Sequence, residues 1–127
     1  MSVSAVRDAH AAVVLVVEDE TLTRCAVAEH LREAGYIVVE TASGEEAIAM
    51  CKSDLSIDIV FTDIQLIGSA SGWDVADYVQ ADRPNVLVLY TSGKSIDHGR
   101  CIPGSTFLAK PYQYHDVVNV CARLRAK

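Results

Sequence analysis

Charged and polar side chains of this chain stand directly after short apolar segments. The segments are Val13–Val17, Ile57–Thr62, Val86–Tyr90 and Thr106–Ala109, and the side chains that follow them are, in the same order, Glu18 and Asp19, Asp63, Thr91, and Lys110. If the segments are parallel strands, their carboxyl ends meet at one edge of a sheet, where such sheets bind ligands. Three carboxylates beside an ammonium and a hydroxyl are suited to hold a divalent cation and a phosphoryl group.

The three carboxylates carry most of this prediction. Like charges held close together repel and raise one another's pKa values, which is costly without a counter-ion. Mg²⁺ resolves the conflict, because it prefers oxygen ligands and commonly combines one or two carboxylates with phosphate oxygens. One acid after a strand is usually a solvated loop residue, but these five side chains in this order predict a site.

The segments between the polar positions indicate how a fold would bring them together. Ile37–Thr41 adds a fifth predicted strand. Apolar residues recur at helical spacing after the first three strands and after the last. They are Leu22, Cys25, Ala28 and Leu31; Ala47, Ile48 and Cys51; Val75, Ala76 and Val79; and Val117, Val120, Cys121 and Leu124.

Where a fourth helix is due, the pattern fails. Gly93–Ser105 contains three glycines, one proline and few apolar residues, so at most a turn or two of helix is expected there. Elsewhere the alternation predicts an α/β fold, a doubly wound, five-stranded parallel sheet with helices on both faces and a shortened or irregular fourth helix.

Composition and charge limit the classes of function. The chain has 127 residues, of which 50% are hydrophobic, enough for one domain with a core. Its net charge of −6 argues against direct binding to nucleic acid. No segment approaches the roughly 20 apolar residues of a membrane span, and no targeting signal is evident. We expect a cytoplasmic protein that does not insert into a membrane.

The order Glu18-Asp19, Asp63, Thr91-Ser92 and Lys110-Pro111 resembles that of response-regulator receiver domains of two-component signalling, as in the single-domain chemotaxis regulators. The resemblance implies a flavodoxin-like strand order, 2-1-3-4-5. It assigns residues 13–127 to the receiver domain and leaves residues 1–12 as an N-terminal extension.

The resemblance also implies a role for each residue of the site. Asp63 is the expected phosphoryl acceptor, and Thr91 and Lys110 are expected to bind phosphoryl oxygens. The expected ligands of Mg²⁺ are Glu18 (through a water), Asp19, Asp63 and the backbone carbonyl of Gln65.

A switch is implied as well. Thr91 and Phe107 are expected to change position on phosphorylation, together with the irregular segment Gly93–Ser105. We also predict a cis peptide bond between Lys110 and Pro111, because the chain must turn there while the ammonium enters the site.

The function implied is transfer of a phosphoryl group from a histidine kinase or histidine phosphotransfer protein to Asp63, assisted by positioning and charge neutralisation. The protein would catalyse only its own phosphorylation and dephosphorylation. We expect no output domain after Lys127, and we therefore expect the signal to pass by contact with a protein target. A free-standing regulator, a phosphorelay shuttle, a phosphate sink and a receiver from a hybrid kinase all fit the residues.

The loop after the acceptor departs from the family pattern. Ile67 stands where the family usually has proline, and Gly72 comes one residue later than usual. We therefore expect a differently shaped loop beside an intact acceptor.

Two other functions use similar residues. A phosphate hydrolase of the haloacid-dehalogenase type needs an acid two residues after its nucleophile, but Gln65 occupies that position. A flavodoxin-like cofactor binder needs a phosphate-binding loop after the first strand, but Glu18-Asp19-Glu20 would repel phosphate.

Overall fold

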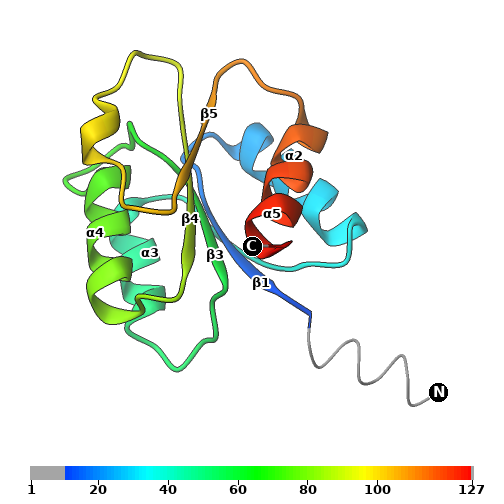
Figure 1. Ribbon diagram of the computed structural model, residues 1–127, viewed down its shortest axis with the longest axis horizontal. Helices are drawn as coiled ribbons and strands as arrows, with labels where there is room; N and C mark the ends of the chain where they lie inside the picture. The colour runs from blue at the N-terminus through cyan, green and yellow to red at the C-terminus, as the bar shows by residue number, and fades with distance from the viewer. Residues whose placement is uncertain (1–10, 127) are drawn as a thin grey trace.

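Five strands form one parallel sheet in the order β2-β1-β3-β4-β5, which confirms the expected strand order (Figure 1). The strands are β1 (Val13–Val17), β2 (Ile37–Thr41), β3 (Ile59–Asp63), β4 (Leu87–Ser92) and β5 (Thr106–Ala109). This computed structural model describes residues 11–126. Residues 1–10 of the expected N-terminal extension, and Lys127, lie outside the described residues.

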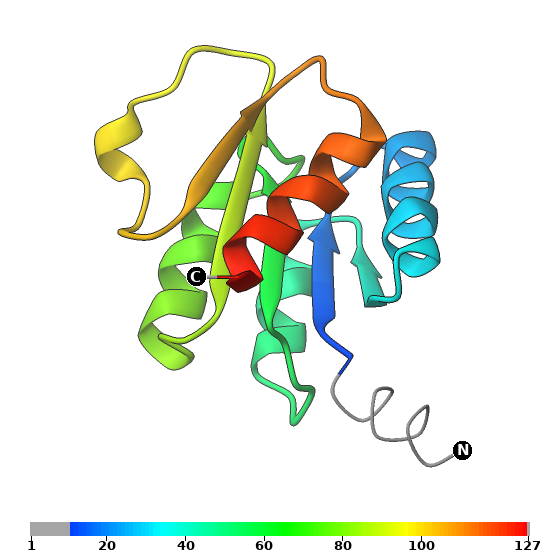
Figure 2. The ribbon, with the colours of Figure 1, turned by 45° about the vertical axis from the view of Figure 1, so that its right-hand side comes forward.

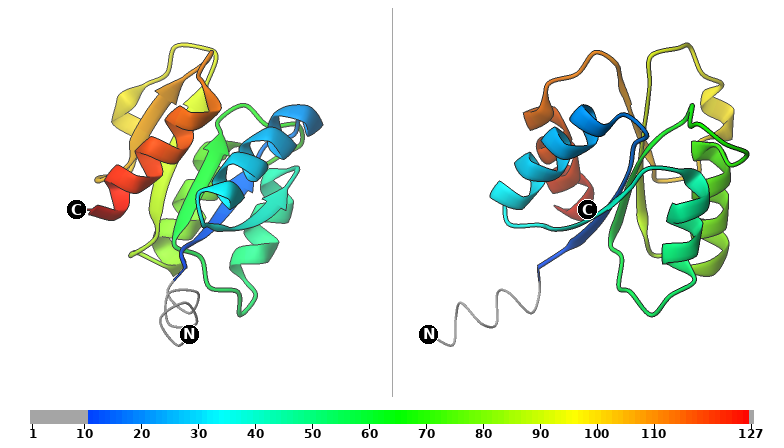
Figure 3. Two further views of the ribbon diagram at one scale, coloured as in Figure 1. Left: turned by 90° about the vertical axis from the view of Figure 1, so that its right-hand side faces the viewer. Right: turned by 180° about the vertical axis from the view of Figure 1, so that it is seen from behind.

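Within residues 11–126, four α-helices cover the two faces of the sheet. They are α2 (Thr21–Glu33), α3 (Gly44–Cys51), α4 (Gly72–Asp82) and α5 (Tyr114–Ala126). Helices α2 and α5 lie together on one face, and α3 and α4 lie together on the other (Figures 2 and 3). The predicted doubly wound architecture is confirmed. None of these helices is both long enough and apolar enough to cross a membrane.

Strand β1 shows why the sheet is covered on both sides. All five of its residues are buried. Val14 and Val16 pack in the cluster under α2 and α5, whereas Leu15 and Val17 pack in the cluster under α3 and α4. Alternate side chains of a strand point to opposite faces, so a continuous apolar run requires a layer on each side.

The sequence misplaced the ends of two strands. β3 runs from Ile59 to Asp63 rather than from 57 to 62, and β4 runs from Leu87 to Ser92 rather than from 86 to 90. Asp63 pairs in register with Thr91, so both polar residues lie inside the sheet. Polarity suggested that these residues had left the strands, but backbone pairing continues through them.

The predicted irregularity of the fourth helix is confirmed. The connection between β4 and β5 contains only the three-residue 3₁₀-helix η1 (His98–Arg100). The sequence suggested that this connection has few apolar contacts. In the structure, Ile96, Cys101 and Ile102 pack against a small apolar cluster formed around Val88 and Tyr90. Apolar side chains without helical periodicity can therefore still hold a segment on the sheet.

Candidate functional site

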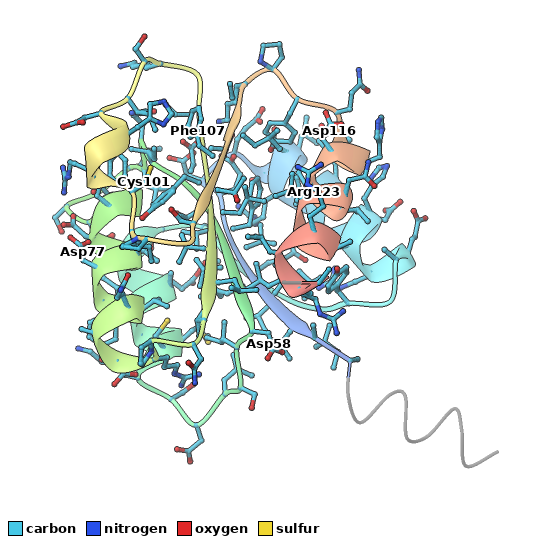
Figure 4. All side chains as sticks on the ribbon, in the orientation of Figure 1. Asp58, Asp77, Cys101, Phe107, Asp116 and Arg123 are labelled. Carbon is cyan, nitrogen blue, oxygen red and sulfur yellow. The ribbon has the colours of Figure 1, made fainter. Side chains whose placement is uncertain are left out.

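Three carboxylates converge at the carboxyl ends of β1 and β3. Glu18 and Asp19 follow β1, and Asp63 is the last residue of β3. One carboxylate oxygen from each residue lies within 4.8 Å of the others; Glu18 and Asp63 are buried and Asp19 is half-buried. Asp58, labelled in Figure 4, precedes β3, so it lies at the opposite edge of the sheet from this cluster. The structure thus brings together the three acids that the sequence singled out.

The carboxylate of Glu18 is buried, and hydrogen bonds hold both its backbone and its side chain. Its backbone N–H donates to the carbonyl of Thr41 at 3.1 Å, which continues the pairing of β1 with β2. Its Oε2 accepts a hydrogen bond from the backbone N–H of Glu20 at 3.1 Å. Burial raises the pKa of Glu18; the Glu20 N–H and the Lys110 charge oppose this shift, and the neighbouring carboxylates add to it. A cation near Glu18 would therefore favour its ionised form.

Lys110 supplies the positive charge of the site. Its Nζ lies 2.6 Å from Asp63 Oδ2 and 3.7 Å from Glu18 Oε1. Burial disfavours the ammonium, but the hydrogen bond to Asp63 and the surrounding carboxylate charges outweigh burial and raise the pKa of Lys110. The Lys110–Pro111 peptide bond is cis, as predicted.

Two buried polar atoms of the site have no hydrogen-bond partner among the described residues. They are Thr91 Oγ1 and Glu18 Oε1. Buried polar atoms are rarely left unpaired, because desolvation without a replacement bond is costly. Both atoms belong to residues that were predicted to meet a metal, a water or a phosphoryl oxygen.

The loop between β3 and α4 donates hydrogen bonds to two of the acids. The backbone N–H of Gln65 donates to Asp63 Oδ1 at 3.2 Å, and that of Ile67 donates to Asp19 Oδ2 at 2.9 Å. Proline has no N–H, so the second bond exists because Ile67 stands where the family usually has proline. The departure from the family pattern therefore gives Asp19 a backbone donor.

Ser92 is a site residue to which the sequence assigned no role. It is buried, and its hydroxyl donates to the side-chain carbonyl of Gln65 at 2.6 Å. The bond joins the end of β4 to the loop after Asp63. Its only signal in the sequence was its place directly after Thr91.

Phe107 does not lie in the acid cluster. It is half-buried on β5, packs against the cluster around Tyr90, and its ring meets that of His98 edge-on at 5.4 Å. Figure 4 shows Phe107 and Cys101 on the side of the molecule where the β4–β5 connection lies. The two residues expected to form the switch therefore lie in different places. Thr91 is beside Asp63 in the sheet, and Phe107 is beside η1.

The donor set suits Mg²⁺ better than a transition metal. The clustered ligand atoms are carboxylate oxygens, which Mg²⁺ and other hard cations prefer. Two of the three acids are buried, so a dication would offset repulsion that solvent cannot screen. Glu18 Oε1, which has no hydrogen-bond partner among the described residues, is a further reason to expect a ligand there.

The comparison with protein families agrees with this geometry. A model of the response regulator receiver domain matches residues 14–121, which is most of the chain. The chain therefore belongs to the response regulator receiver domain family. Membership of this family favours a receiver over the hydrolase and the cofactor binder, the two alternatives left by the sequence.

Relatives and solved structures support the same class. The chain is 33% identical over 118 residues to the transcriptional regulatory protein PdtaR of Mycobacterium tuberculosis, covering 87% of this chain and 57% of that protein. A response regulator receiver protein from Sinorhizobium medicae has a TM-score of 0.86 at 31% identity, covering 91% of this chain and 94% of the other. The receiver domain of the hybrid histidine kinase CckA has a TM-score of 0.77 at 28% identity, covering 88% and 97%.

The curated relatives are longer than the part that matches. The chain spans little more than half of PdtaR, and 19% of a cyclic di-GMP phosphodiesterase of Thermotoga maritima that is 33% identical over 75 residues. The shared part is the receiver domain. The activities in the names of these relatives belong to those proteins.

Proposed function

We propose that this receiver domain accepts a phosphoryl group on Asp63 from the phosphohistidine of a histidine kinase or histidine phosphotransfer protein. The observation that carries the proposal is the 2.6 Å pair of Lys110 Nζ and Asp63 Oδ2 inside a cluster of three carboxylates. A buried acid with an adjacent ammonium and two further acids has the charges that phosphoryl transfer requires.

In the proposed reaction a carboxylate oxygen of Asp63 attacks the phosphorus, and the phosphorus–nitrogen bond to the donor histidine breaks. Lys110 is already hydrogen-bonded to Asp63 and can follow the new charge onto a phosphoryl oxygen. The Thr91 hydroxyl has no partner among the described residues and can donate to another phosphoryl oxygen. No protein group needs to act as a general acid or base.

Glu18, Asp19, Asp63 and the backbone carbonyl of Gln65 are the proposed Mg²⁺ ligands, with Glu18 acting through a water. When bound, Mg²⁺ would neutralise charge on the acids and on the phosphoryl oxygens. The protein's own contribution is to hold the acids within 4.8 Å of one another before any ligand arrives.

The proposed partners are proteins. A cavity of about 460 Å³ opens beside Lys110 and is lined by Glu20, Thr23, Gly93, Pro111, Tyr112 and Tyr114 in addition to Lys110. We propose that the imidazole of the donor approaches the acids from this side. Phosphorylation would then be read by a protein target, without direct contact with nucleic acid or a membrane.

Mass spectrometry of the intact protein tests the proposal. Incubation with phosphoramidate and Mg²⁺ is expected to add one phosphoryl group to the wild type and none to Asp63→Asn. Omission of Mg²⁺ with a chelator present is expected to prevent the reaction. Asp54→Asn is the matched control, because Asp54 is an exposed acid in the connection that leads into β3.

The control should behave like the wild type. Addition of a phosphoryl group to folded Asp63→Asn, or equal addition with and without Mg²⁺, would contradict the assignment of acceptor or metal.

A further inference from the structure

The loop between β3 and α4 is fastened to the first turn of α3 by one carboxylate. Oε2 of Glu45 accepts hydrogen bonds from the backbone N–H of Ser69 at 3.0 Å and from the Ser69 hydroxyl at 2.9 Å. Glu45 is exposed and belongs to none of the metal-ligand positions proposed above. Its contact joins residues 24 positions apart in the chain.

Close packing on either side of this contact leaves the loop little room. A Cβ on Gly68, which has a φ of +105°, would lie 2.8 Å from Glu45 Oε2. A Cβ on Gly44 would lie 2.7 Å from the carbonyl oxygen of Ala70. The lack of a side chain at Gly68 and at Gly44 thus lets the loop approach Glu45 and the start of α3 closely.

The fastened loop carries the donors that orient the acids. Ile67, two residues before Ser69, donates its N–H to Asp19 Oδ2 at 2.9 Å, and Gln65 donates to Asp63 Oδ1 at 3.2 Å. Gly68, Ser69 and Ser71 have little side-chain bulk with which to hold the loop by packing. Leu66 packs against the cluster under α3 and α4, and the rest of residues 65–70 is restrained by hydrogen bonds to the acids, to Ser92 and to Glu45.

We propose that Glu45 is a positioning residue for the metal site, acting through Ser69 and the Ile67 N–H on the carboxylate of Asp19. The proposal rests on the proposed function, because it takes Asp19 as a ligand of Mg²⁺. Removal of Glu45 would release the loop and let the Asp19 carboxylate rotate, so Mg²⁺ would bind more weakly. Once Mg²⁺ is bound, the acids are held by the ion itself and the transfer step should be unchanged.

Glu46 provides a matched control. It is the neighbouring exposed acid in the same first turn of α3, but its Oε1 accepts from the backbone N–H of Ala42 at 2.8 Å, and among the described residues its side chain makes no hydrogen bond to the loop. Replacing either residue by alanine removes one negative charge from the same helix N-terminus. A difference between the two variants therefore isolates the contact with Ser69.

The experiment compares wild type, Glu45→Ala, Glu45→Gln, Glu46→Ala and Ser69→Ala. The Kd for Mg²⁺ is measured by calorimetry, and the rate of phosphorylation by phosphoramidate is measured as a function of Mg²⁺ concentration. Outer residues that orient metal ligands typically contribute about 10- to 100-fold in affinity, and Glu45 is one step further out, so we expect a loss of about 3- to 10-fold in Glu45→Ala. The rate at saturating Mg²⁺ should stay within about twofold of wild type.

The remaining variants sharpen the result. Glu45→Gln keeps an oxygen that can accept from Ser69 and should recover part of the lost affinity. Ser69→Ala keeps its backbone N–H and should lose less than Glu45→Ala, and adding it to Glu45→Ala should cause no further loss. Glu46→Ala should bind Mg²⁺ as wild type does.

Two results would overturn the positioning role. One is an equal Kd for Glu45→Ala and Glu46→Ala, with both folded by circular dichroism. The other is a slower reaction at saturating Mg²⁺ with the Kd unchanged. Failure of the wild type itself to bind Mg²⁺ or accept a phosphoryl group is a distinct outcome, which overturns the proposed function and the positioning role together.

Discussion

Two segments leave the sheet beside Asp63, and they are held in different ways. The β3–α4 loop, residues 64–71, has apolar packing at Ile64 and Leu66, and it is tied by hydrogen bonds to charged groups, to Asp19 and Asp63 on one side and to Glu45 on the other. Residues 93–105, between β4 and β5, are held mainly by apolar and aromatic contacts around Tyr90. Both segments follow strands that pair side by side in the sheet.

The contacts of the second segment are broad and weakly directional. The guanidinium of Arg100 lies 4.9 Å from the ring of Trp73 on α4, and that ring lies 5.0 Å from the ring of Tyr90. Ile102 donates its N–H to the Tyr90 hydroxyl at 3.3 Å. Hydrogen bonds to charged groups fix distance and angle, whereas apolar contact tolerates sliding. The first segment is therefore suited to set the geometry of the site, and the second is suited to move in response to it.

Gly72, the first residue of α4 directly after the first segment, and Gly93, the first residue of the second segment, give the largest expected difference. A Cβ on Gly72 would lie 2.2 Å from the carbonyl oxygen of Asp63 and 2.7 Å from Ile64 Cα, both backbone atoms. Gly72→Ala is therefore expected to lower the free energy of unfolding by about 1–3 kcal/mol, as overpacking does. A Cβ on Gly93 would have its nearest neighbour at 3.9 Å, on Lys110, so Gly93→Ala should stay within about 0.5 kcal/mol of wild type.

Urea unfolding of Gly72→Ala, Gly93→Ala and the wild type measures the two changes in the free energy of unfolding. Equal losses of unfolding free energy in the two variants would mean that both segments are equally restrained. That result would contradict the difference between the two segments described above.

The second expectation concerns movement of residues 93–105. Hydrogen exchange of the free protein and of its Mg²⁺–beryllofluoride complex, a mimic of the phosphorylated state, should differ most between Ser92 and Phe107 and less in residues 64–71. Arg100→Gln removes a contact that contributes about 0.5–1 kcal/mol at an exposed site, and should speed exchange in residues 93–105 of the free protein. Arg123→Gln, an exposed arginine on α5, is the control. Unchanged exchange between Ser92 and Phe107 on complex formation would place the switch elsewhere.

The smallest expected effect is a dependence on pH of the stability that the Glu45–Ser69 contact contributes. The backbone N–H of Ser69 is the main cause that lowers the pKa of Glu45 from its ordinary value of 4.5. A lowered pKa means that the contact stabilises the fold fully above the ordinary pKa and loses this contribution as the pH falls through the lowered value. The difference in unfolding free energy between wild type and Glu45→Gln should therefore shrink below pH 4.5.

Urea unfolding from pH 7 downward checks this, with Glu46→Gln as the control for loss of charge in the same helix turn. A difference between wild type and Glu45→Gln that grows on acidification would show that the carboxylate does not prefer its ionised form in the fold.

Much of the fold followed from local pattern. The continuous apolar run Val13–Val17 predicted a strand covered on both faces, and it is one. Serine is a residue type favoured at helix N-termini, and the Ser43 side chain before α3 accepts from the N–H of Glu46 at 3.1 Å. Strand ends were harder, because Asp63 and Thr91 are polar yet remain paired inside the sheet.

The sequence by itself determined which side chains stand at the carboxyl ends of the strands, because apolar periodicity defines parallel strands and these strands end at one edge. Glu18, Asp19, Asp63, Thr91 and Lys110 were identified in this way. That reasoning placed the acids near one another, and only the tertiary structure set the distances.

The tertiary structure alone decided how the two flanking segments are held. Glu45 and Ser69 are 24 positions apart, and Arg100 in the β4–β5 connection lies over the ring of Trp73 on α4. Neither pair has a periodic signal, because each contact depends on the lengths of the intervening elements and on how closely their backbones pack. Hydrophobic pattern specifies which face of an element is buried, but the side chains that meet across two surface segments are chosen by the packing of the whole domain.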